Sequence, residues 1–352
     1  MEHPLIRFGF IGAGAIAHWS ASKLTEHPSG RLVAVQDLNR ERREELCAAF
    51  PGAKPVADAA EIFSDPEIDA VYIAVPNKFH VPLAIAALEA GKHVLLEKPF
   101  AMSAGEAMQA VAVAERTGRV LTLGMNQRFA SASQRFRTLA VDGAFGEIYH
   151  AKAYWLRRSG IPKLGTWFGS KDLAGGGCLY DIGVHVLDLC LYVMDNFEPV
   201  SAFGSSYGKF GHRGLGEGSW GKSEKSDVAF EVEDFASGQI RMANGATVSL
   251  DVSWARFAEE PERVDVELYG TEAGGKVYAD KIFRRDDTFG NYYTLENPHA
   301  ANAHAHGDRF HNLINHLHGT EPLCVTMAQA LTVQRILDAL AESSQTGTSI
   351  NL

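Results

Sequence analysis

The chain has 352 residues, of which 46% are hydrophobic, and its formal net charge at pH 7 is −10. This length predicts two domains of about 150 residues each, and the negative charge argues against a nucleic-acid surface, which needs a basic face. The four cysteines show no CxxC spacing, and the sequence contains neither a leader-peptide pattern nor an apolar run of about 18 residues. We therefore expect a cytoplasmic protein that acts on a small molecule, without nucleic-acid or membrane partners.

Short apolar runs alternate with helical patterns in the first third of the chain. The candidate strands are residues 6–11, 32–37, 70–75, 93–97 and 120–123. Strands that alternate with helices indicate a parallel, doubly wound sheet. We therefore expect residues 1–124 to form an α/β domain of this type.

A glycine turn follows the first strand, in a Gly-x-Gly-x-x-Ala pattern that ends at Ala17. The glycines let the backbone approach a pyrophosphate, and the N-terminus of the following helix favours its charge. We expect Gly12, Gly14, Ala15 and Ile16 to contact a dinucleotide in a Rossmann domain. The alternative is a glycine turn that binds no ligand.

Asp37 ends the second strand, 20 residues after Ala17. At this distance a carboxylate can bond the adenosine ribose of NAD and repel the 2′-phosphate of NADP. Alternatively, Asp37 caps a helix that starts near Arg40. Arg40, Arg42 and Arg43 follow closely and could soften the exclusion of NADP. Because the Asp37 carboxylate repels a 2′-phosphate, we still expect NAD as the preferred of the two cofactors.

Two more strand ends carry candidate residues, since loops at the carboxyl ends of parallel strands line the ligand crevice. Pro76 and Asn77 are expected at the nicotinamide, while His80 either joins them or packs the next helix. Glu97 and Lys98 precede Pro99 at the next strand end. A lysine beside a positively charged nicotinamide has its ammonium form disfavoured, which suits acid–base work. The alternative for Lys98 is a solvent-facing residue paired with Glu97.

The pattern changes after residue 124. Helices are expected at 134–141 and 181–194, and strands at 200–207, 228–235, 239–242, 247–254 and 264–269. Successive strands with short turns predict antiparallel pairing. We expect residues 125–352 to form an α+β domain with a large, open, mostly antiparallel sheet and helices on one face.

A glycine run at 175–177 precedes Asp181 and His185, which are four residues apart and share one helix face. Oxidation of an alcohol needs a base and a donor that polarises the oxygen. We expect His185 and Lys98 to fill these roles. Taken singly, Asp181 could be a helix cap and His185 a core residue.

This ordered set of motifs resembles the glucose-fructose oxidoreductase, inositol dehydrogenase and MocA family of NAD(P)-dependent oxidoreductases over nearly the whole chain. The resemblance implies that Lys98 contacts the substrate hydroxyl and nicotinamide ribose, His185 is the general acid/base, and Asp181 holds substrate and histidine. It also implies that Asn126 and Arg128 lie where cofactor and substrate meet, although Arg128 could equally tie the two domains together. Homodimers or homotetramers built through the open sheet are expected as well.

Several segments could choose the substrate. An aromatic wall with arginine donors suits a sugar ring, so we expect contacts from Trp167 and from Arg157 or Arg158, unless one arginine pairs with an acid. If both arginines faced the pocket, an acidic sugar would become plausible. The glycine-rich residues 208–221 are expected to be a mobile loop, either a plain connection or a lid.

Six histidines lie near the C-terminus, at positions 299, 304, 306, 311, 316 and 318. No cysteine or acidic pattern accompanies them, so we expect no metal site. Residues 304 and 306 could still border the active site.

The expected function is hydride transfer between nicotinamide and a secondary alcohol of a sugar or cyclitol. Two alternatives remain. One is a glycoside hydrolase that oxidises its substrate transiently with bound NAD, and the other is a non-catalytic NAD(P) sensor. Intact Lys98, Asp181 and His185 argue against the sensor.

Overall fold

The computed structural model describes residues 3–220, 229–300 and 306–352. Contacts divide the chain into two units. The first unit is Met1–Met125 with His306–Leu331, and the second is Asn126–Ala305 with Thr332–Leu352. The sequence analysis expects all of 125–352 in the second domain. In the structure, residues 306–331 belong to the first unit instead.

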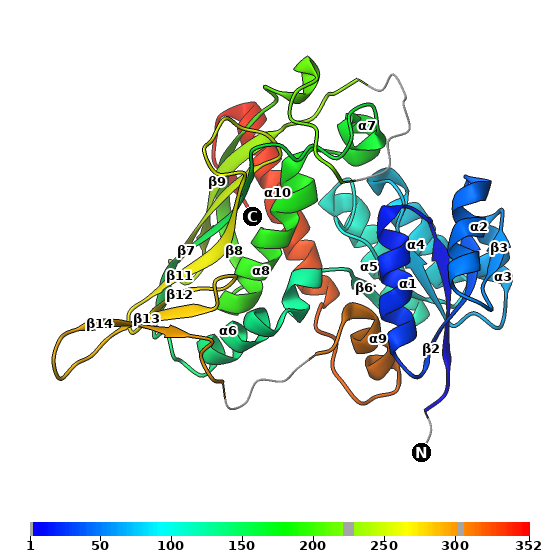
Figure 1. Ribbon diagram of the computed structural model, residues 1–352, viewed down its shortest axis with the longest axis horizontal. Coiled ribbons are helices and arrows are strands. Elements are labelled where there is room, and N and C mark those ends of the chain that lie inside the picture. Colours follow the sequence, from blue (N-terminus) through cyan, green and yellow to red (C-terminus); the bar gives the residue numbers. More distant parts are fainter. Residues whose placement is uncertain (1–2, 221–228, 301–305) are drawn as a thin grey trace. The chain divides into compact units, whose positions relative to one another are not determined.

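The first unit contains a six-stranded parallel sheet (Figure 1). Its strands are β1 (Ile6–Ile11), β2 (Gly30–Gln36), β3 (Lys54–Val56), β4 (Ala70–Ile73), β5 (His93–Leu96) and β6 (Leu121–Leu123). Their order, β3-β2-β1-β4-β5-β6, is that of the dinucleotide-binding Rossmann fold. The predicted doubly wound sheet is therefore confirmed, with β3 as an additional short edge strand.

Helices pack on this sheet. They are α1 (Ala15–Glu26), α2 (Arg40–Ala49), α3 (Ala59–Ser64), η1 (Asn77–Phe79), α4 (His80–Glu89), α5 (Ala104–Thr117) and α9 (Arg309–Leu317). Helix α9 lies beside α1 (Figure 1), and its Phe310, Leu313 and Ile314 belong to the same buried core as Phe8 and Phe10. This shared core explains why 306–331 belongs to the first unit.

The second unit contains a nine-stranded sheet. Its strands are β7 (Ile148–Arg157), β8 (Pro199–Tyr207), β9 (Phe235–Met242), β10 (Thr247–Ser253), β11 (Glu262–Gly270), β12 (Gly274–Lys276), β13 (Lys281–Arg285), β14 (Tyr292–Glu296) and β15 (Ile350–Asn351). The order is β14-β13-β12-β11-β7-β10-β9-β8-β15. Among the described strands, only the central pair β7 and β10 is parallel, so the expected mostly antiparallel sheet is confirmed.

The predicted strand at 239–242 is confirmed, because it lies within β9 (Phe235–Met242). The strand predicted at 228–235 is wrong, because β9 begins only at Phe235. Residue 228 lies outside the described residues, and 229–234 form no strand. In this stretch the carboxylates of Glu233 and Asp234 bind backbone N–H groups of other segments instead of lying along a regular strand.

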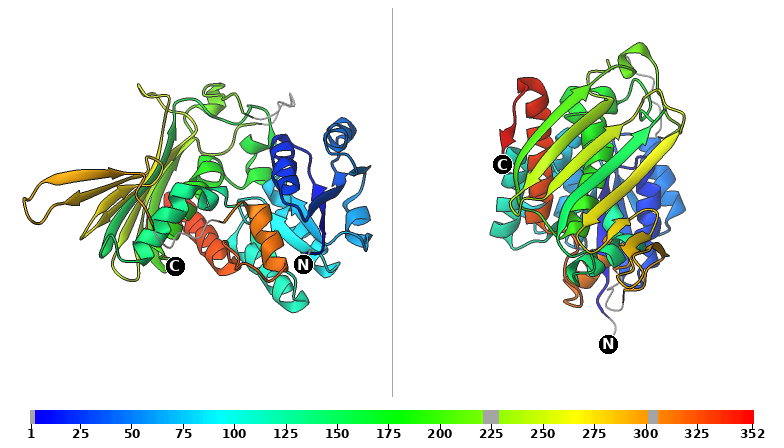
Figure 2. Two further views of the ribbon diagram at one scale, coloured as in Figure 1. Left: turned by 60° about the horizontal axis from the view of Figure 1, so that its bottom comes forward. Right: turned by 90° about the vertical axis from the view of Figure 1, so that its left-hand side faces the viewer.

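Helices of the second unit cover one face of its sheet. They are η2 (Asn126–Phe129), α6 (Ser131–Val141), η3 (Trp167–Gly169), α7 (Lys171–Ala174), the π-turn η4 (Leu179–Gly183), α8 (Val184–Met194), η5 (Gly211–Arg213) and α10 (Met327–Thr346), whose first turn belongs to the first unit. Figure 2 shows that, among the described residues of the second unit, no helix covers the other face. The predicted open sheet with helices on one face is therefore confirmed.

Helix α8 is the central helix of the second unit, and all eleven of its residues are buried. Among the described residues, only the stretch 171–194, which contains α8, is long and apolar enough to cross a membrane, and 94% of its most apolar window is buried within the protein. This burial identifies it as a core helix. The cytoplasmic location stays a prediction.

Candidate active site

The glycine turn after β1 leaves space for a ligand. Gly12 has a φ of +97°, and a Cβ there would lie 2.2 Å from the carbonyl oxygen of Ala74, so only glycine fits. At Gly14, by contrast, a Cβ would meet nothing within 4 Å. In the described part of the chain no side chain caps α1, whose first turn carries no acidic residue. A helix start with open backbone N–H groups fits a pyrophosphate.

Asp37 is tied to the glycine turn. Its Oδ2 accepts a hydrogen bond from the Ala13 N–H at 2.7 Å, and its Oδ1 accepts one from the Asn39 N–H at 2.8 Å. The cap of α2 is Asn39, whose side chain accepts from the Arg42 N–H. The alternative in which Asp37 caps α2 is therefore wrong.

The loop after β4 is fixed by a buried histidine. Asn77 is buried at the start of η1, and His80 is 1% exposed at the start of α4. The two ring nitrogens of His80 lie 2.8 Å from the carbonyl oxygen of Pro99 and 3.0 Å from that of Val75. Burial lowers the pKa of His80. The ring thus connects the loops that follow β4 and β5, which assigns it a structural role at the start of α4.

Glu97 belongs to a buried polar network of the first unit. Its Oε1 accepts from the Tyr72 hydroxyl at 2.7 Å and lies 2.9 Å from Nη1 of Arg309, and its Oε2 accepts from the Lys98 N–H at 3.3 Å. Arg309 also donates to Ser20 Oγ at 2.7 Å. Burial raises the pKa of the Tyr72 phenol, with the charge of Glu97 as a second cause, so this hydroxyl remains a donor. The network fixes the backbone that carries the half-buried Lys98.

Asp181 lies in the π-turn η4, directly before α8. Such turns are rare and occur frequently at functional sites. Asp181 Oδ2 accepts a hydrogen bond of 2.9 Å from Nε1 of the fully buried Trp254. His185, 9% exposed in the first turn of α8, has its ring centroid 6.0 Å from that of Trp155. The structure therefore places Asp181 beside Trp254, which the sequence analysis did not assign to the site, and His185 beside Trp155 of the expected aromatic wall.

Arg128 is enclosed within the second unit. Its Nε and Nη2 donate to the two carboxylate oxygens of Asp188 at 2.9 and 2.6 Å, and both side chains are almost fully buried. The guanidinium also lies over the rings of Tyr192 and Phe197. This position places Arg128 in the packing of η2 on α8. Its contact with a substrate stays a prediction. Asn126 begins the same short turn.

The two arginines expected near the substrate, Arg157 and Arg158, both bind groups of the protein itself. Nε of Arg157 lies 2.9 Å from Glu262 Oε1, which also accepts from Nε1 of Trp155 at 2.7 Å. Arg157 lies over the Trp155 ring at 4.6 Å. Burial raises the pKa of Glu262, but the hydrogen bonds from Trp155 and Arg157 outweigh burial and lower it overall. Arg158 Nη1 donates to a backbone carbonyl at 3.1 Å.

Trp167 lies in an aromatic cluster. Its ring stacks on Phe168 at 3.8 Å, and Phe168 meets Trp220 edge-on at 5.5 Å. The described part of the glycine-rich segment, 208–220, is bonded to residues 159–161, where Gly160 and Ile161 N–H groups donate to the Gly216 carbonyl. Residue 221 lies outside the described residues, and the lid remains a prediction.

Two family models match the chain. The oxidoreductase family with an NAD-binding Rossmann fold matches residues 6–125, and the GFO/IDH/MocA C-terminal domain matches residues 133–275. The chain belongs to the GFO/IDH/MocA oxidoreductase family. It is 32% identical over 355 residues to the D-glucoside 3-dehydrogenase of Escherichia coli K12, covering 100% of this chain and 99% of that protein.

Other members of the GFO/IDH/MocA family extend this likeness. The chain is 30% identical to the levoglucosan dehydrogenase of Pseudarthrobacter phenanthrenivorans, covering 80% of this chain and 74% of that protein. A solved NAD-binding protein from Listeria innocua is 25% identical, with a TM-score of 0.80 and coverage of 98% and 96%. Levoglucosan dehydrogenase in complex with NADH and levoglucosan shares the fold, at 22% identity, a TM-score of 0.83 and coverage of 98% and 99%.

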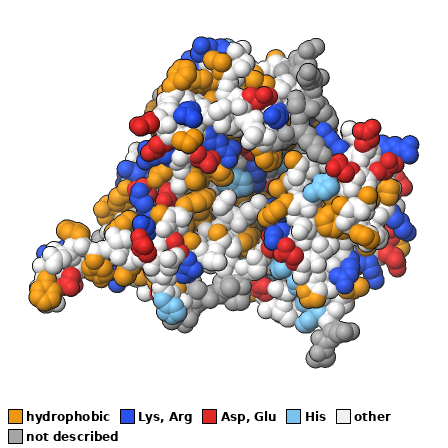
Figure 3. Space-filling model, viewed as in Figure 1, with side chains coloured by type: hydrophobic (Ala, Val, Ile, Leu, Met, Phe, Trp, Pro, Cys, Tyr) orange, Lys and Arg blue, Asp and Glu red, His pale blue; other side chains and the backbone are white. Residues whose placement is uncertain are grey.

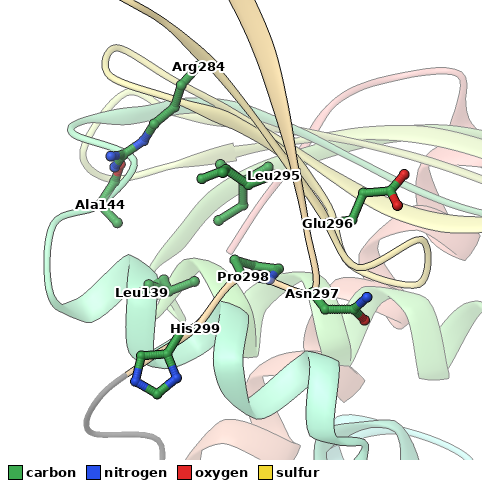
Figure 4. A pocket seen from close by; sticks show the side chains of 9 residues that line it. Leu139, Ala144, Arg284, Leu295, Glu296, Asn297, Pro298 and His299 are labelled. Atoms are coloured by element: carbon green, nitrogen blue, oxygen red, sulfur yellow. The ribbon is translucent and has the colours of Figure 1, made fainter.

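The structure also contains a cavity that lies apart from the predicted site. A cavity of about 280 Å³ lies between α6 and the β13–β14 hairpin, lined in part by Leu139, Arg284, Leu295 and His299 (Figure 4), and it contains none of the predicted site residues. Among the described residues no three His, Cys, Asp or Glu side chains are grouped to hold a metal ion. His306 is bonded to Glu321, and position 304 lies outside the described residues.

Proposed function

We propose that this chain is an NAD-dependent dehydrogenase that oxidises a secondary alcohol of a neutral sugar or glycoside. The observation that carries the proposal is the full-length match to a D-glucoside 3-dehydrogenase. The geometry agrees with it, because the first unit has an open glycine turn at a helix start and the second holds an aspartate and a histidine in the consecutive turns η4 and α8. Levoglucosan dehydrogenase and 1,5-anhydro-D-fructose reductase are further relatives that act on sugars.

In the proposed reaction, the first unit would supply the NAD site and Lys98, and the second would supply Asp181 and His185. NAD supplies the hydride acceptor, held by Gly12, Gly14 and Asp37. Lys98 would donate a hydrogen bond to the substrate hydroxyl and so favour its deprotonation. His185 would take the hydroxyl proton as general base. Asp181, itself held by the Trp254 indole, would orient the substrate and the histidine.

The environment of Arg157 favours an uncharged sugar. Because Glu262 pairs with Arg157, the positive charge of this arginine is already balanced within the protein. Trp155, which is close to both Arg157 and His185, offers an aromatic surface of the kind on which a sugar ring packs. Trp167 is the other aromatic candidate. The carboxylate of an acidic sugar would find the charge of Arg157 already neutralised by Glu262.

A substrate panel tests the proposal. Methyl glucosides, 1,5-anhydro sugars, glucuronides and inositols are each mixed with the protein and NAD, and reduced nicotinamide is followed by absorbance. We expect turnover with the neutral glycosides or anhydro sugars and little with glucuronides. Release of free sugar without added cofactor would instead indicate a glycoside hydrolase and contradict the proposed reaction.

Asp37 provides a separate test of cofactor choice. Asp37→Asn keeps an oxygen that can accept from the Ala13 N–H but removes the charge that repels a 2′-phosphate. We expect the ratio of kcat/KM for NAD to that for NADP to fall about tenfold or more, equivalent to about 1.4 kcal/mol. Asp58→Asn, which changes the cap of α3, is the matched control and should leave the ratio unchanged. An unchanged ratio in Asp37→Asn would remove this carboxylate from cofactor selection.

We further propose that the chain forms a homodimer or homotetramer through the uncovered face of the nine-stranded sheet (Figure 2). Phe203 is 49% exposed and Tyr207 45% exposed on β8. Hydrophobic side chains are also exposed on the β13–β14 hairpin (Figure 3), where Phe289 is 79% and Tyr292 84% exposed. Light scattering should report two or four chains, and Phe203→Glu should shift the mass downward. A monomeric wild-type protein would contradict the proposal.

A further inference from the structure

The helix start that carries the proposed catalytic pair is bound by a residue more than fifty positions later in the chain. Oε1 of Glu233 accepts hydrogen bonds from the Gly177 N–H at 2.8 Å and from the Leu179 N–H at 3.0 Å. The backbone carbonyl of Glu233 accepts a third, from the Cys178 N–H at 3.1 Å. The first N–H groups of a helix have no partner within the helix, so one residue here satisfies three consecutive donors.

Gly177 is shaped for this contact. A Cβ at position 177 would lie 1.9 Å from the carbonyl oxygen of Glu233. Real Cβ atoms do not approach a backbone oxygen so closely, so any other residue would push the helix start away from Glu233. The glycine run before Asp181 therefore serves the docking of Glu233.

Asp234, the next residue, is linked to the side chain of Asp181 through Trp254. The Trp254 N–H donates to the backbone carbonyl of Asp234 at 2.8 Å, and the Trp254 indole donates to Asp181. The Asp234 carboxylate in turn accepts from the backbone N–H groups of residues 209–211. Glu233 thus binds the backbone at the start of the π-turn. Asp234 binds Trp254, which in turn binds the carboxylate of Asp181 within the turn.

The electrostatics of Glu233 agree with a capping role. Burial raises the pKa of its carboxyl group, and the hydrogen bonds from the Gly177 and Leu179 N–H groups counter that effect. An ionised carboxylate at a helix N-terminus also interacts favourably with the helix dipole. The neighbouring Asp234 raises the pKa further.

We propose that Glu233 is a positioning residue for the proposed reaction, which fixes the π-turn so that Asp181 and His185 keep their working geometry. The inference rests on the proposed function. Its contacts all lie within the second unit, so Glu233 acts on the rate of the chemical step and leaves NAD binding to the first unit unchanged. The hydrogen-bond acceptor, rather than the negative charge, is the part of Glu233 that the turn requires.

Two variants at this position separate the acceptor from the charge. Glu233→Gln keeps a carbonyl oxygen for the two N–H groups, whereas Glu233→Ala leaves them without an acceptor. We expect Glu233→Ala to lower kcat about 100-fold, the size of effect produced by a displacement of about 1 Å at a reacting group. Glu233→Gln should retain kcat within about fivefold, and the KM for NAD should stay within about twofold in both.

Glu231→Ala is the matched control, because Glu231 is an exposed glutamate two residues away that caps a different helix, through the Lys171 N–H at 3.1 Å. Its kcat should equal that of the wild type. All rates are measured below the onset of thermal unfolding of each variant, so that loss of folded protein does not enter kcat.

Amide hydrogen exchange gives a second readout that needs no substrate. The peptide spanning 177–185 should exchange faster in Glu233→Ala and at the wild-type rate in Glu233→Gln and Glu231→Ala. Unchanged exchange in Glu233→Ala, or equal loss of kcat in the Ala and Gln variants, would overturn the inference. If the wild type oxidises no sugar of the panel, the proposed function fails, while the exchange rates still decide whether Glu233 holds the turn.

Discussion

Replacing His185 by glutamine or Lys98 by methionine is expected to lower kcat about 1000-fold or more. Positioned proton transfer contributes about 10² to 10⁴ in rate. His185→Gln removes the proposed base and Lys98→Met removes the hydrogen bond that favours deprotonation, and both keep a side chain of similar size. Binding of NADH, followed by nicotinamide fluorescence, should change little, because neither side chain supplies the glycine turn or the Asp37 carboxylate. The comparison of kcat with NADH affinity therefore separates proton transfer from cofactor binding.

Two exposed residues supply controls of the same chemical type. His3→Gln changes a histidine that precedes β1, and Lys54→Met changes a lysine of the edge strand β3. Neither should alter kcat by more than about twofold, the spread expected for surface changes away from a site. Near-wild-type turnover in both Lys98→Met and His185→Gln would refute the proposed chemistry.

Breaking the ion pair between Arg128 and Asp188 is expected to cost the largest amount of stability. Asp188→Ala leaves a fully buried guanidinium without its carboxylate, and removing one partner of a buried pair costs about 3–5 kcal/mol. The free energy of unfolding, measured by denaturant titration, should fall by that amount. The double variant Arg128→Met with Asp188→Leu should recover much of the loss, because it removes both charges together.

The same double variant decides the role of Arg128. If the guanidinium only packs η2 on α8, the folded double variant should bind sugar with a wild-type KM. A KM raised tenfold or more, about 1.4 kcal/mol, would return Arg128 to the substrate site. A stability of Asp188→Ala equal to that of the wild type would contradict the importance of the pair itself.

Local patterns in the sequence predict most of the fold. The alternation of strands and helices before residue 124, and the succession of strands after it, lead to the two observed sheets. Short strands such as β3 and β12 have too few residues to show a period. The return of α9 to the first unit depends on Phe310 packing against Phe8 and Phe10, a contact between segments 300 residues apart that no local pattern reveals.

The site divides in the same way. The glycine turn, Lys98, Asp181 and His185 stand in recognisable spacings, but the groups that hold them do not. Arg309, which pairs with Glu97, and Trp254, which bonds Asp181, are separated from their partners by 212 and 73 residues. Such partners are set by tertiary packing. Asp37 shows a further limit, since the spacing left open whether it caps α2, and only the contacts of Asn39 answer that question.

Hydride transfer from a sugar carbon to nicotinamide can be tested directly with a deuterium-labelled substrate. A glycoside that is turned over in the panel is prepared with deuterium at the carbon to be oxidised and incubated with NAD and the wild-type protein. We predict one deuterium at C4 of the reduced nicotinamide, a keto-glycoside of matching amount, and a slower rate with the labelled compound. Consumption of the substrate with no deuterium in the nicotinamide would contradict dehydrogenation by this chain.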